Sequence, residues 1–380
     1  MGPASPAEEQ VKIRNLKHIG HLDLPGGGQV SVKEGIAYVG HMAPPIGTSI
    51  VDVSNPKAPR ILAQLEVPSN THSHKARVTD HLLVVNYERY KTTPEPMRPG
   101  IRILNVSSPS KPKEVAFVET GGIGVHRFDL DSRYAYISTE LEGYIGAITV
   151  VYDLADPTRV KEVGRWWQPG QWTAGGEKPH WKGDLHRTHH PLRWENRLYI
   201  SCWFGGFAIV DATDLARLQT ISTFDWSPPY LAPTHTALRV PFKIRGRDFL
   251  VVTDEHTTDD RYTDPSPFLW LVDITDERNP IPVSNYIVSE TAVENRAGRF
   301  GCHQPQEQVY DNILAVTWFS GGLRLVDIAD PYRPQEVGYF IPDPVAGHRS
   351  AQSNDVFYDG NGLLYVIDRH NGLDILERTK

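Results

Sequence analysis

The sequence has little of what marks a disulfide-rich, membrane-spanning or nucleic-acid-binding protein. Only two of its 380 residues are cysteines, Cys202 and Cys302, which is too few for a disulfide framework and favours a reducing, cytoplasmic location. No stretch approaches the roughly 18–20 apolar residues that a transmembrane helix needs. The net charge of −7 argues against a nucleic acid or an anionic membrane as partner. With nucleic acid and membranes disfavoured, we expect a small molecule as the binding partner.

Familiar catalytic motifs are absent as well. The chain has no glycine-rich phosphate loop, no Gly-x-Ser-x-Gly nucleophile elbow and no His-Glu-x-x-His pair. No segment shows a convincing helical period beyond a single turn. Nothing singles out a nucleophilic serine, so other residues have to supply any chemistry.

A short apolar motif that carries Asp or Asn recurs seven times. It is clearest at 49–56, which reads Ser-Ile-Val-Asp-Val-Ser-Asn-Pro. Its acidic or amide residue falls at Asp52, Asn105, Asp153, Asp211, Asp273, Asp327 and Asp374. A period of roughly 50 residues, with about four short strands per unit, is typical of a β-propeller. The repeat therefore predicts an all-β, seven-bladed β-propeller.

The last unit has three expected strands and lacks a fourth. The segment 16–25 aligns with the fourth strand of the first unit, at 60–68. We expect this N-terminal strand to complete the C-terminal blade and close the ring, which would remove exposed sheet edges. The predicted organisation is a disordered tail, 1–15, followed by a single propeller domain, 16–380.

Histidines recur at one place in the repeat, at or just before the innermost strand of a unit. Innermost strands converge on the channel of a propeller, so histidines far apart in sequence should meet. His74, His126 and His190 lie the same number of residues before the first turn of their units, and side chains at equal distances from that turn should point the same way. His235 and His303 lie near the same position. Neutral imidazoles that converge are typical of a transition-metal site. The predicted ligands are His74, His126, His190, His235 and His303. The alternative is that these histidines only line a polar channel.

Further residues on the same face are candidates for catalysis or substrate binding. Glu255 and His256 can move protons near neutral pH, and His189 adjoins a predicted ligand. Arginines can hold an anionic group through two hydrogen bonds, and aromatic rims suit an apolar or ring-shaped substrate. The predicted substrate-binding residues are His72, Arg127, Trp203, Trp318, His348 and Arg369. Solvated carboxylates, surface arginine pairs and aromatic caps at blade ends are the ordinary alternatives.

A tryptophan-rich insertion at 166–181 precedes one of the histidine-bearing strands. Such a loop can form a lid over a propeller mouth, or it can pack against a second subunit. A homo-oligomer formed through this insertion is therefore a possible partner arrangement.

The Ile-Val-Asp-Val-Ser-Asn-Pro unit and its six relatives resemble the LVIVD-repeat group of β-propellers, over about residues 16–376. The segment Thr71-His72-Ser73-His74 is more distantly similar to the selenium-binding protein/methanethiol oxidase family, which implies a copper-dependent oxidase. That family's cysteine motifs are not recognisable here, which leaves its thiol substrate in doubt. Carotenoid-cleavage oxygenases, with seven blades and a four-histidine iron site, are an architectural analogy.

These observations predict a metal-dependent enzyme that acts on a small organic, possibly aromatic, substrate at the channel mouth. Because an all-histidine set without an obvious carboxylate resembles the iron and copper oxidase sites just named, an oxidoreductase with Fe or Cu is favoured. A lyase or hydrolase that uses Zn or Mn at the same site is the first alternative. A propeller scaffold that only binds partners is the second.

Overall fold

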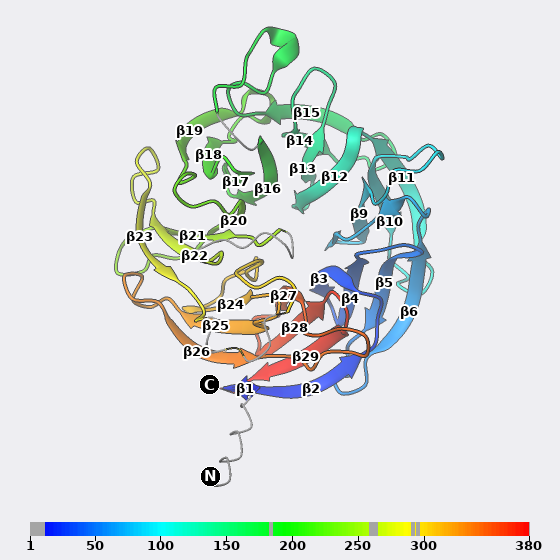
Figure 1. The fold of residues 1–380 in the computed structure, drawn as a ribbon. Helices are drawn as coiled ribbons and strands as arrows, with labels where there is room; N and C mark the ends of the chain where they lie inside the picture. The colour runs from blue at the N-terminus through cyan, green and yellow to red at the C-terminus, as the bar shows by residue number, and fades with distance from the viewer. Residues whose placement is uncertain (1–11, 182–184, 258–264, 290–292, 294–296, 380) are drawn as a thin grey trace.

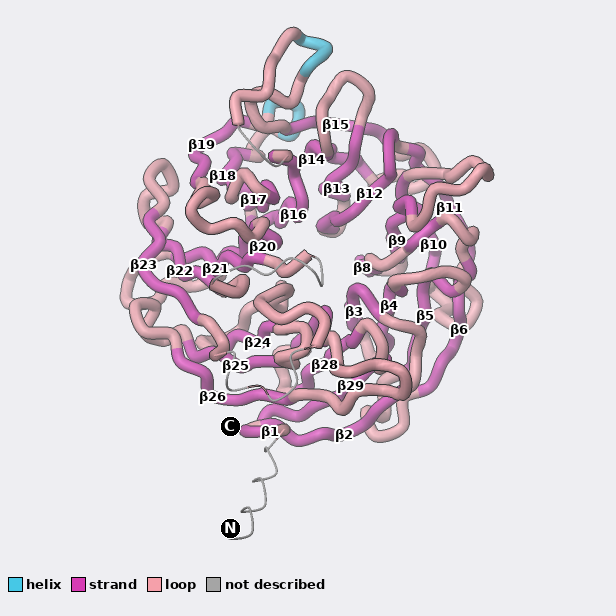
Figure 2. Tube along the Cα trace, viewed as in Figure 1, coloured by secondary structure: helices cyan, strands magenta, loops and turns pink. Residues whose placement is uncertain are grey.

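The computed structural model describes residues 12–181, 185–257, 265–289, 293 and 297–379. These residues form antiparallel strands joined by turns, with two single-turn 3-10 helices, η1 (Thr173–Gly175) and η2 (Leu215–Arg217). The strands are grouped into sheets that stand around a common centre, as Figure 1 shows, and the loops that join them run over the two faces and the rim (Figure 2). Within the described residues, no helix is long and apolar enough to cross a membrane.

Within each four-stranded unit the strands follow one another outward from the centre. The first sheet has the order β3 (Gly27–Lys33), β4 (Ile36–His41), β5 (Ile46–Asp52), β6 (Arg60–Glu66). The next two units contain β7 (Thr71–His72), β8 (Ala76–Thr79), β9 (Leu82–Arg89), β10 (Gly100–Asn105), β11 (Lys113–Glu119), and β12 (Gly121–Leu130), β13 (Tyr134–Glu140), β14 (Ala147–Asp153), β15 (Lys161–Trp166). A single residue pair, Gly124 with Glu88, joins these two units into one sheet.

The second half of the chain repeats the arrangement. Two units joined through the pair Trp203–Thr234 contain β16 (His186–Trp194), β17 (Arg197–Trp203), β18 (Phe207–Asp211), β19 (Gln219–Phe224), and β20 (Thr234–Arg239), β21 (Phe249–Asp254), β22 (Leu269–Asp273), β23 (Ile281–Tyr286). The last two sheets have the orders β24 (Ile313–Thr317), β25 (Leu323–Asp327), β26 (Gln335–Phe340), β1 (Ile13–Arg14), and β27 (Ser353–Tyr358), β28 (Leu363–Asp368), β29 (Gly372–Arg378), β2 (Leu16–Leu22).

Burial explains the hydrophobic pattern of the strands. The middle strands have sheets packed on both faces, so β4 and β5 are buried almost throughout, whereas the outer strand β6 is half exposed. The apolar residues of neighbouring sheets pack together, as where Val39 and Val51 of the first sheet meet Ile367 and Ile375 of the last. Most of the core therefore lies between adjacent sheets.

The recurring Asp or Asn has a structural role in six of its seven positions. Its side chain accepts the backbone N–H two residues further on and so sets the turn into the outer strand. The six pairs are Asp52–Ser54, Asn105–Ser107, Asp153–Ala155, Asp211–Thr213, Asp273–Thr275 and Asp327–Ala329. These carboxylates are turn formers on the rim, which separates them from any chemistry at the centre.

The seventh position, Asp374, joins the two ends of the chain. Strand β2 pairs with β29 from Leu16–Arg378 to Leu22–Leu373, and Figure 1 shows the two strands side by side. The Nε2 of His18 and the Nδ1 of His21 each lie 2.8 Å from Asp374 Oδ1. The N-terminal segment from residue 16 thus pairs with the C-terminal sheet, as the repeat alignment predicts.

Regular structure begins earlier than the sequence suggests. Ile13 and Arg14, expected in the tail, form β1 and pair with Phe340 and Tyr339 of β26. Residues 1–11 of the predicted tail lie outside the described residues.

Candidate metal centre

The inner strands share an irregularity near their first residues. In β3, β12, β20 and β27 the pairing with the second strand skips one residue, which is Gly28, His126, His235 and Asn354 respectively. A skipped residue is a β-bulge, and bulges re-aim the side chain that they carry. In three of these strands the bulge turns a side chain, that of His126, His235 or Asn354, into the central pocket.

Hydrogen bonds between sheets hold these bulges in place. Ser201 and Thr253 donate from their hydroxyls to the backbone carbonyls of His235 and His303, at 2.6 and 2.7 Å. Thr317 does the same to the carbonyl of Asn354, at 3.0 Å. Each of these hydroxyls sits on the second strand of one unit and each carbonyl on the next unit, so the backbone of the site is fixed from one sheet to the next.

Six imidazoles form a continuous series at this level. Successive ring centroids, from His72 through His74, His126, His189 and His235 to His303, lie 3.9, 5.0, 4.8, 4.6 and 4.2 Å apart. All of them except His189 line a cavity of about 230 Å³, hereafter the histidine pocket. The structure therefore brings together four of the five predicted ligands, His74, His126, His235 and His303.

The fifth predicted ligand, His190, points elsewhere and His189 takes its place. The prediction equated Trp194 with Val78 and Leu130, but Trp194 pairs with Arg197 across its turn as Thr79 pairs with Leu82. The count was therefore one residue too long in β16, and one residue changes the direction of a strand side chain. His190 instead lies 3.2 Å from Arg77 and 3.4 Å from Glu307.

Hydrogen bonds fix the tautomers of three imidazoles in the series. His189 donates from Nδ1 to the carbonyl of His235 at 2.7 Å, and His303 donates from Nδ1 to the carbonyl of Asn354 at 2.5 Å. The Nδ1 of His235 lies 2.8 Å from the hydroxyl of Thr236, which donates its own proton to Gln304. With Nδ1 protonated, Nε2 of each ring carries a lone pair. This is the arrangement of histidines that bind metals.

The Nε2 lone pairs gather around Glu255. The Nε2 of His235 lies 3.8 Å from one oxygen of Glu255, and the Nε2 of His303 lies 3.7 Å from the other. Ligand atoms of His189, His235 and Glu255 all lie within 4.8 Å of one another. The Nε2 of His189 is buried and has no hydrogen-bond partner among the described residues. Three imidazole nitrogens and a carboxylate oxygen are a donor set that suits a transition metal.

Burial also sets the charge state of these rings. Desolvation lowers the pKa of His189, His235 and His303 well below the ordinary value of 6.5. Nearby cations, among them Arg127, lower these pKa values further. The three imidazoles are therefore neutral, which is the form that binds a metal.

The other half of the series is already paired by hydrogen bonds. Glu88 accepts from His126 Nδ1 at 2.8 Å and lies 3.1 Å from His72 Nε2. Burial alone would raise the pKa of Glu88, but these two histidines hold it well below its usual range. Asn86 donates to Nδ1 of His74 while its own oxygen accepts from Lys75, so the proton of His74 sits on Nε2. His72, His74 and Glu88 also have ligand atoms within 4.8 Å of one another, but their nitrogens are largely engaged.

One predicted aromatic contact is wrong by a single residue. Trp318 is fully buried in the core, with its ring 5.6 Å from that of Tyr286. Its backbone N–H bonds to Gly322 as that of Cys202 bonds to Gly206, so Phe319, the next residue, is the counterpart of Trp203. The Phe319 ring lies 4.6 Å from His303, and the Trp203 ring lies 4.7 Å from His189.

The remaining candidates are divided between the histidine pocket and its surroundings. Arg127, Arg369 and Trp203 line the pocket together with Glu255. His256 is turned aside, and its Nδ1 accepts the backbone N–H of Phe300. His348 is exposed and stacks on His370 at 3.7 Å in a neighbouring cavity of about 460 Å³.

The tryptophan-rich insertion projects from the outer rim beyond β15 in Figure 1. None of residues 166–181 lines the histidine pocket. Trp172 is exposed there, and Trp181 stacks on His186 at 4.9 Å. Residues 182–184 lie outside the described residues.

Sequence reasoning under-used one position of the repeat. In three units the second strand carries an Asn, Ser or Thr whose side chain holds the bulge region, and the residue two positions further on faces the histidines. These pairs are Asn86 and Glu88, Ser201 and Trp203, and Thr253 and Glu255. The second residue of each pair contacts the imidazole series. Aligning these positions across units would have identified both carboxylates. Lys75, which also lines the pocket, was not among the candidates.

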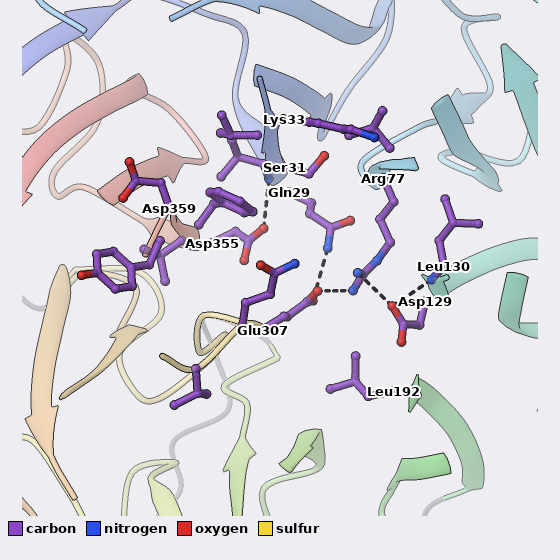
Figure 3. A pocket seen from close by; sticks show the side chains of 18 of the residues that line it. Gln29, Ser31, Lys33, Arg77, Asp129, Leu130, Leu192, Glu307, Asp355 and Asp359 are labelled. Atoms are coloured by element: carbon purple, nitrogen blue, oxygen red, sulfur yellow. Dashed lines mark hydrogen bonds and ion pairs between the residues drawn. The ribbon is translucent and has the colours of Figure 1, made fainter. Parts of the chain in front are cut away.

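A second, larger cavity of about 970 Å³ lies at the turns between first and second strands, at the opposite ends of the inner strands. Figure 3 shows Arg77 between Asp129 and Glu307, with Asp355 facing the same space. Burial raises the pKa of Asp355 to about 7. Arg77, Asp129 and Glu307 are paired with one another, whereas Asp355 accepts the backbone N–H of Val30.

The fold defined by these sheets is that of a β-propeller. The structure is similar to the C-terminal WD40 domain of Sif2, with a TM-score of 0.58 and 12% identity over 96% of this chain and 99% of that one. It is also similar to the N-terminal domain of Nup159 (TM-score 0.55, 11% identity, 97% and 96% covered) and to Sqt1 of Saccharomyces cerevisiae (0.55, 10%, 94% and 87%). At these identities the likeness establishes the fold alone.

The sequence places one unit in a known repeat family. The family model of the LVIVD repeat matches residues 27–64, within strands β3 to β6. The chain thus contains an LVIVD repeat. No curated protein matches the sequence.

Proposed function

We propose that this propeller is a metal-dependent enzyme whose metal is held by His189, His235, His303 and Glu255. The observation that carries the proposal is the buried Nε2 of His189, which has no hydrogen-bond partner among the described residues although its Nδ1 is fixed by a backbone carbonyl. A buried nitrogen lone pair without a partner is costly unless something binds it. His235 and Glu255 offer ligand atoms within 4.8 Å of a ligand nitrogen of His189, and the Nε2 of His303 lies 3.7 Å from the same carboxylate.

The surrounding residues prepare this site. Arg299 pairs with Glu255 at 3.2 Å and holds the carboxylate toward the imidazoles. His126 presents a ring next to His189 while Glu88 fixes its Nδ1 proton, so the Nε2 of His126 is available to accept a proton from a substrate. A bound transition metal supplies redox or Lewis-acid chemistry at this position.

Oxidoreductase chemistry on a small organic substrate is the reaction class that we favour. A mixed set of imidazoles and one carboxylate suits non-haem iron better than copper, and the rings of Trp203 and Phe319 flank the imidazoles. A hydrolase or lyase with Zn or Mn uses the same donor set and is the second candidate, since Glu255 has the carboxylate that such sites often contain.

Metal analysis of protein purified without added metal tests the proposal. About one transition metal per chain is expected, and Glu255→Gln and His235→Ala should each lose it while the circular dichroism spectrum is retained. Oxygen uptake with substrate would assign the oxidoreductase class, and Zn or Mn without oxygen uptake would assign the alternative. Protein that contains no metal and gains no thermal stability from Fe, Cu, Zn or Mn would contradict the site.

We further propose that the sheets form seven blades in a closed ring, with β2 as the outermost strand of the last blade. The register of β2 on β29 supports this closure. We also propose a cytoplasmic location, because Cys202 and Cys302 are both buried as free thiols.

A further inference from the structure

Among the described residues, more cationic than anionic side chains line the histidine pocket. Five cationic side chains of the described residues line it, namely Lys75, Arg127, Arg187, Arg299 and Arg369. The described carboxylates nearby are Glu255, which lines the pocket, and Glu88, which contacts His72 and His126. An imidazole carries no negative charge, so nothing else in the described lining offsets the difference. A metal ion would add to the positive charge.

Arg127 forms no ion pair with a described residue, and Asp355, Glu307 and Glu255 act on it only at longer range. It is 1% exposed, and its Nε, Nη1 and Nη2 all lack a hydrogen-bond partner within the described part of the chain. A buried guanidinium without hydrogen bonds is strongly disfavoured. Its five N–H donors therefore have no acceptor among the described residues.

Lys75 strengthens this positive centre. Its side chain is 3% exposed, and its ammonium forms no hydrogen bond or ion pair with a described residue, while Asn86 accepts its backbone N–H. Lys75 and Arg127 directly follow His74 and His126 in sequence and line the same pocket. Burial and the neighbouring Arg127 lower the pKa of Lys75 well below its usual range, so its ammonium form is stabilised when an anion lies beside it.

Buried arginines elsewhere in the protein do have partners. At the opposite end of the inner strands, Arg77 pairs with Asp129 and Glu307. Between the outer strands, Arg324 pairs with Glu336 at 3.1 Å and stacks over Tyr339. The uncompensated arginine is thus a property of the histidine pocket and not of the fold.

We propose that the histidine pocket binds a small organic anion through its carboxylate, which Arg127 and Lys75 hold beside the imidazoles. A guanidinium offers two parallel N–H groups to a planar carboxylate. The volume of about 230 Å³ limits the ligand to a small molecule, and Trp203, over which Arg187 stacks at 4.4 Å, provides a flat wall for it. This proposal rests on the proposed function for its meaning as substrate recognition, but the anion site itself does not require a metal.

Binding to metal-free protein tests the anion site separately from the metal. Isothermal titration calorimetry with benzoate should show binding, and benzamide, its neutral isostere, should not bind. Arg127→Met should weaken benzoate binding roughly ten- to hundredfold, as expected for the loss of hydrogen bonds to a charged group, and Lys75→Met should weaken it less. Arg324→Met is the matched control, because it removes a buried arginine outside the pocket and should leave binding unchanged.

Thermal unfolding shows whether a variant that loses benzoate binding is still folded. Arg324→Met should lower the melting temperature, since it breaks the ion pair with Glu336, whereas Arg127→Met should not, because it removes a buried charge without a partner. Equal benzoate affinity in wild type and Arg127→Met, or binding of inorganic phosphate but not of benzoate, would overturn the proposal. Benzoate binding through Arg127 in a protein that takes up no metal would reject the metal site alone, and metal uptake without benzoate binding would reject the anion site alone.

Discussion

The Nδ1 of His189 donates a hydrogen bond of 2.7 Å to the backbone carbonyl of His235, and the two rings lie 4.6 Å apart. One proposed ligand is thus oriented by the backbone of another. Because the hydroxyl of Ser201 donates to the same carbonyl at 2.6 Å, the position of the His189 ring depends on three adjacent structural elements at once.

The neighbouring pair His189 and His190 gives a direct test of the site. His189→Gln should abolish stoichiometric metal binding, because its Nε2 belongs to the proposed donor set. His190→Gln, at an equally buried position, should retain the metal, since His190 faces Arg77 and Glu307. Elemental analysis of both purified variants measures the difference. The reverse pattern would restore the ligand set that the sequence alone suggested.

The hydroxyl of Thr236 should control metal affinity from outside the donor set. Thr236→Val keeps the shape of the side chain but removes the acceptor for His235 Nδ1. Loss of such a partner typically weakens metal binding roughly 10- to 100-fold, which metal titration against a competing chelator would measure. Thr149→Val is a suitable control, because the Thr149 hydroxyl is buried without a partner and should not affect the metal. Unchanged affinity in Thr236→Val would argue against Nε2 ligation by His235.

The histidines around Asp374 should make stability depend on pH. The hydrogen bond to Asp374 raises the pKa of His21 above 6.5, with Asp23 acting in the same direction. The stabilisation of the folded state by protonated His21 is therefore complete below pH 6.5 and is lost as the pH rises through the raised pKa of His21. Burial opposes ionisation of Asp374, but His18 and His21 keep its pKa below 3.8, so its contribution is lost only in acid.

Asp374→Asn tests this dependence. The variant should cost about 1–3 kcal/mol of unfolding free energy near pH 5–6 and less above pH 7, as measured by urea denaturation across pH. Asp327→Asn is the control, because Asn105 already forms the same turn elsewhere. A destabilisation that does not change between pH 5 and 8 would contradict the role of His21.

Adjacent aromatic residues should separate stability from binding. Trp318→Ala empties a fully buried core position and should cost about 3–5 kcal/mol. Phe319→Leu removes the ring that lies against His303. It should change the affinity for benzoate and lower the melting temperature less than Trp318→Ala does. Ligand titration and thermal unfolding of the two variants would show whether these effects divide as expected.

The propeller could be predicted because its signal is repeated. Each unit carries the same strand pattern, and the Asp or Asn at the turn marks it; six of these residues proved to be turn formers. The pairing of the segment from Leu16 with the last sheet followed from the same alignment. Repetition averages out local ambiguity, so errors in single strands do not change the fold class.

The details of the site depend on single residues, for which repetition gives no help. A bulge inserts one residue without a clear sequence signal, so His189 and His190 exchanged roles, and the same uncertainty of one residue exchanged Trp318 and Phe319. Glu255 could be identified as a candidate, but its position between His235 and His303 is a distance across two units. Strand register had to be known before the carboxylate could be joined to the imidazoles.

The pairing of β2 with β29 also constrains the order in which the protein can be built. Leu16 finds its partner in Arg378, so one of the first strands to be synthesised has to wait for nearly the last. Pairings this distant in sequence slow folding, because the chain must close a very long loop before it gains the contact. During synthesis, β2 is present without its partner β29 until almost the whole chain has been made, and its unpaired edge can bind another strand throughout that interval.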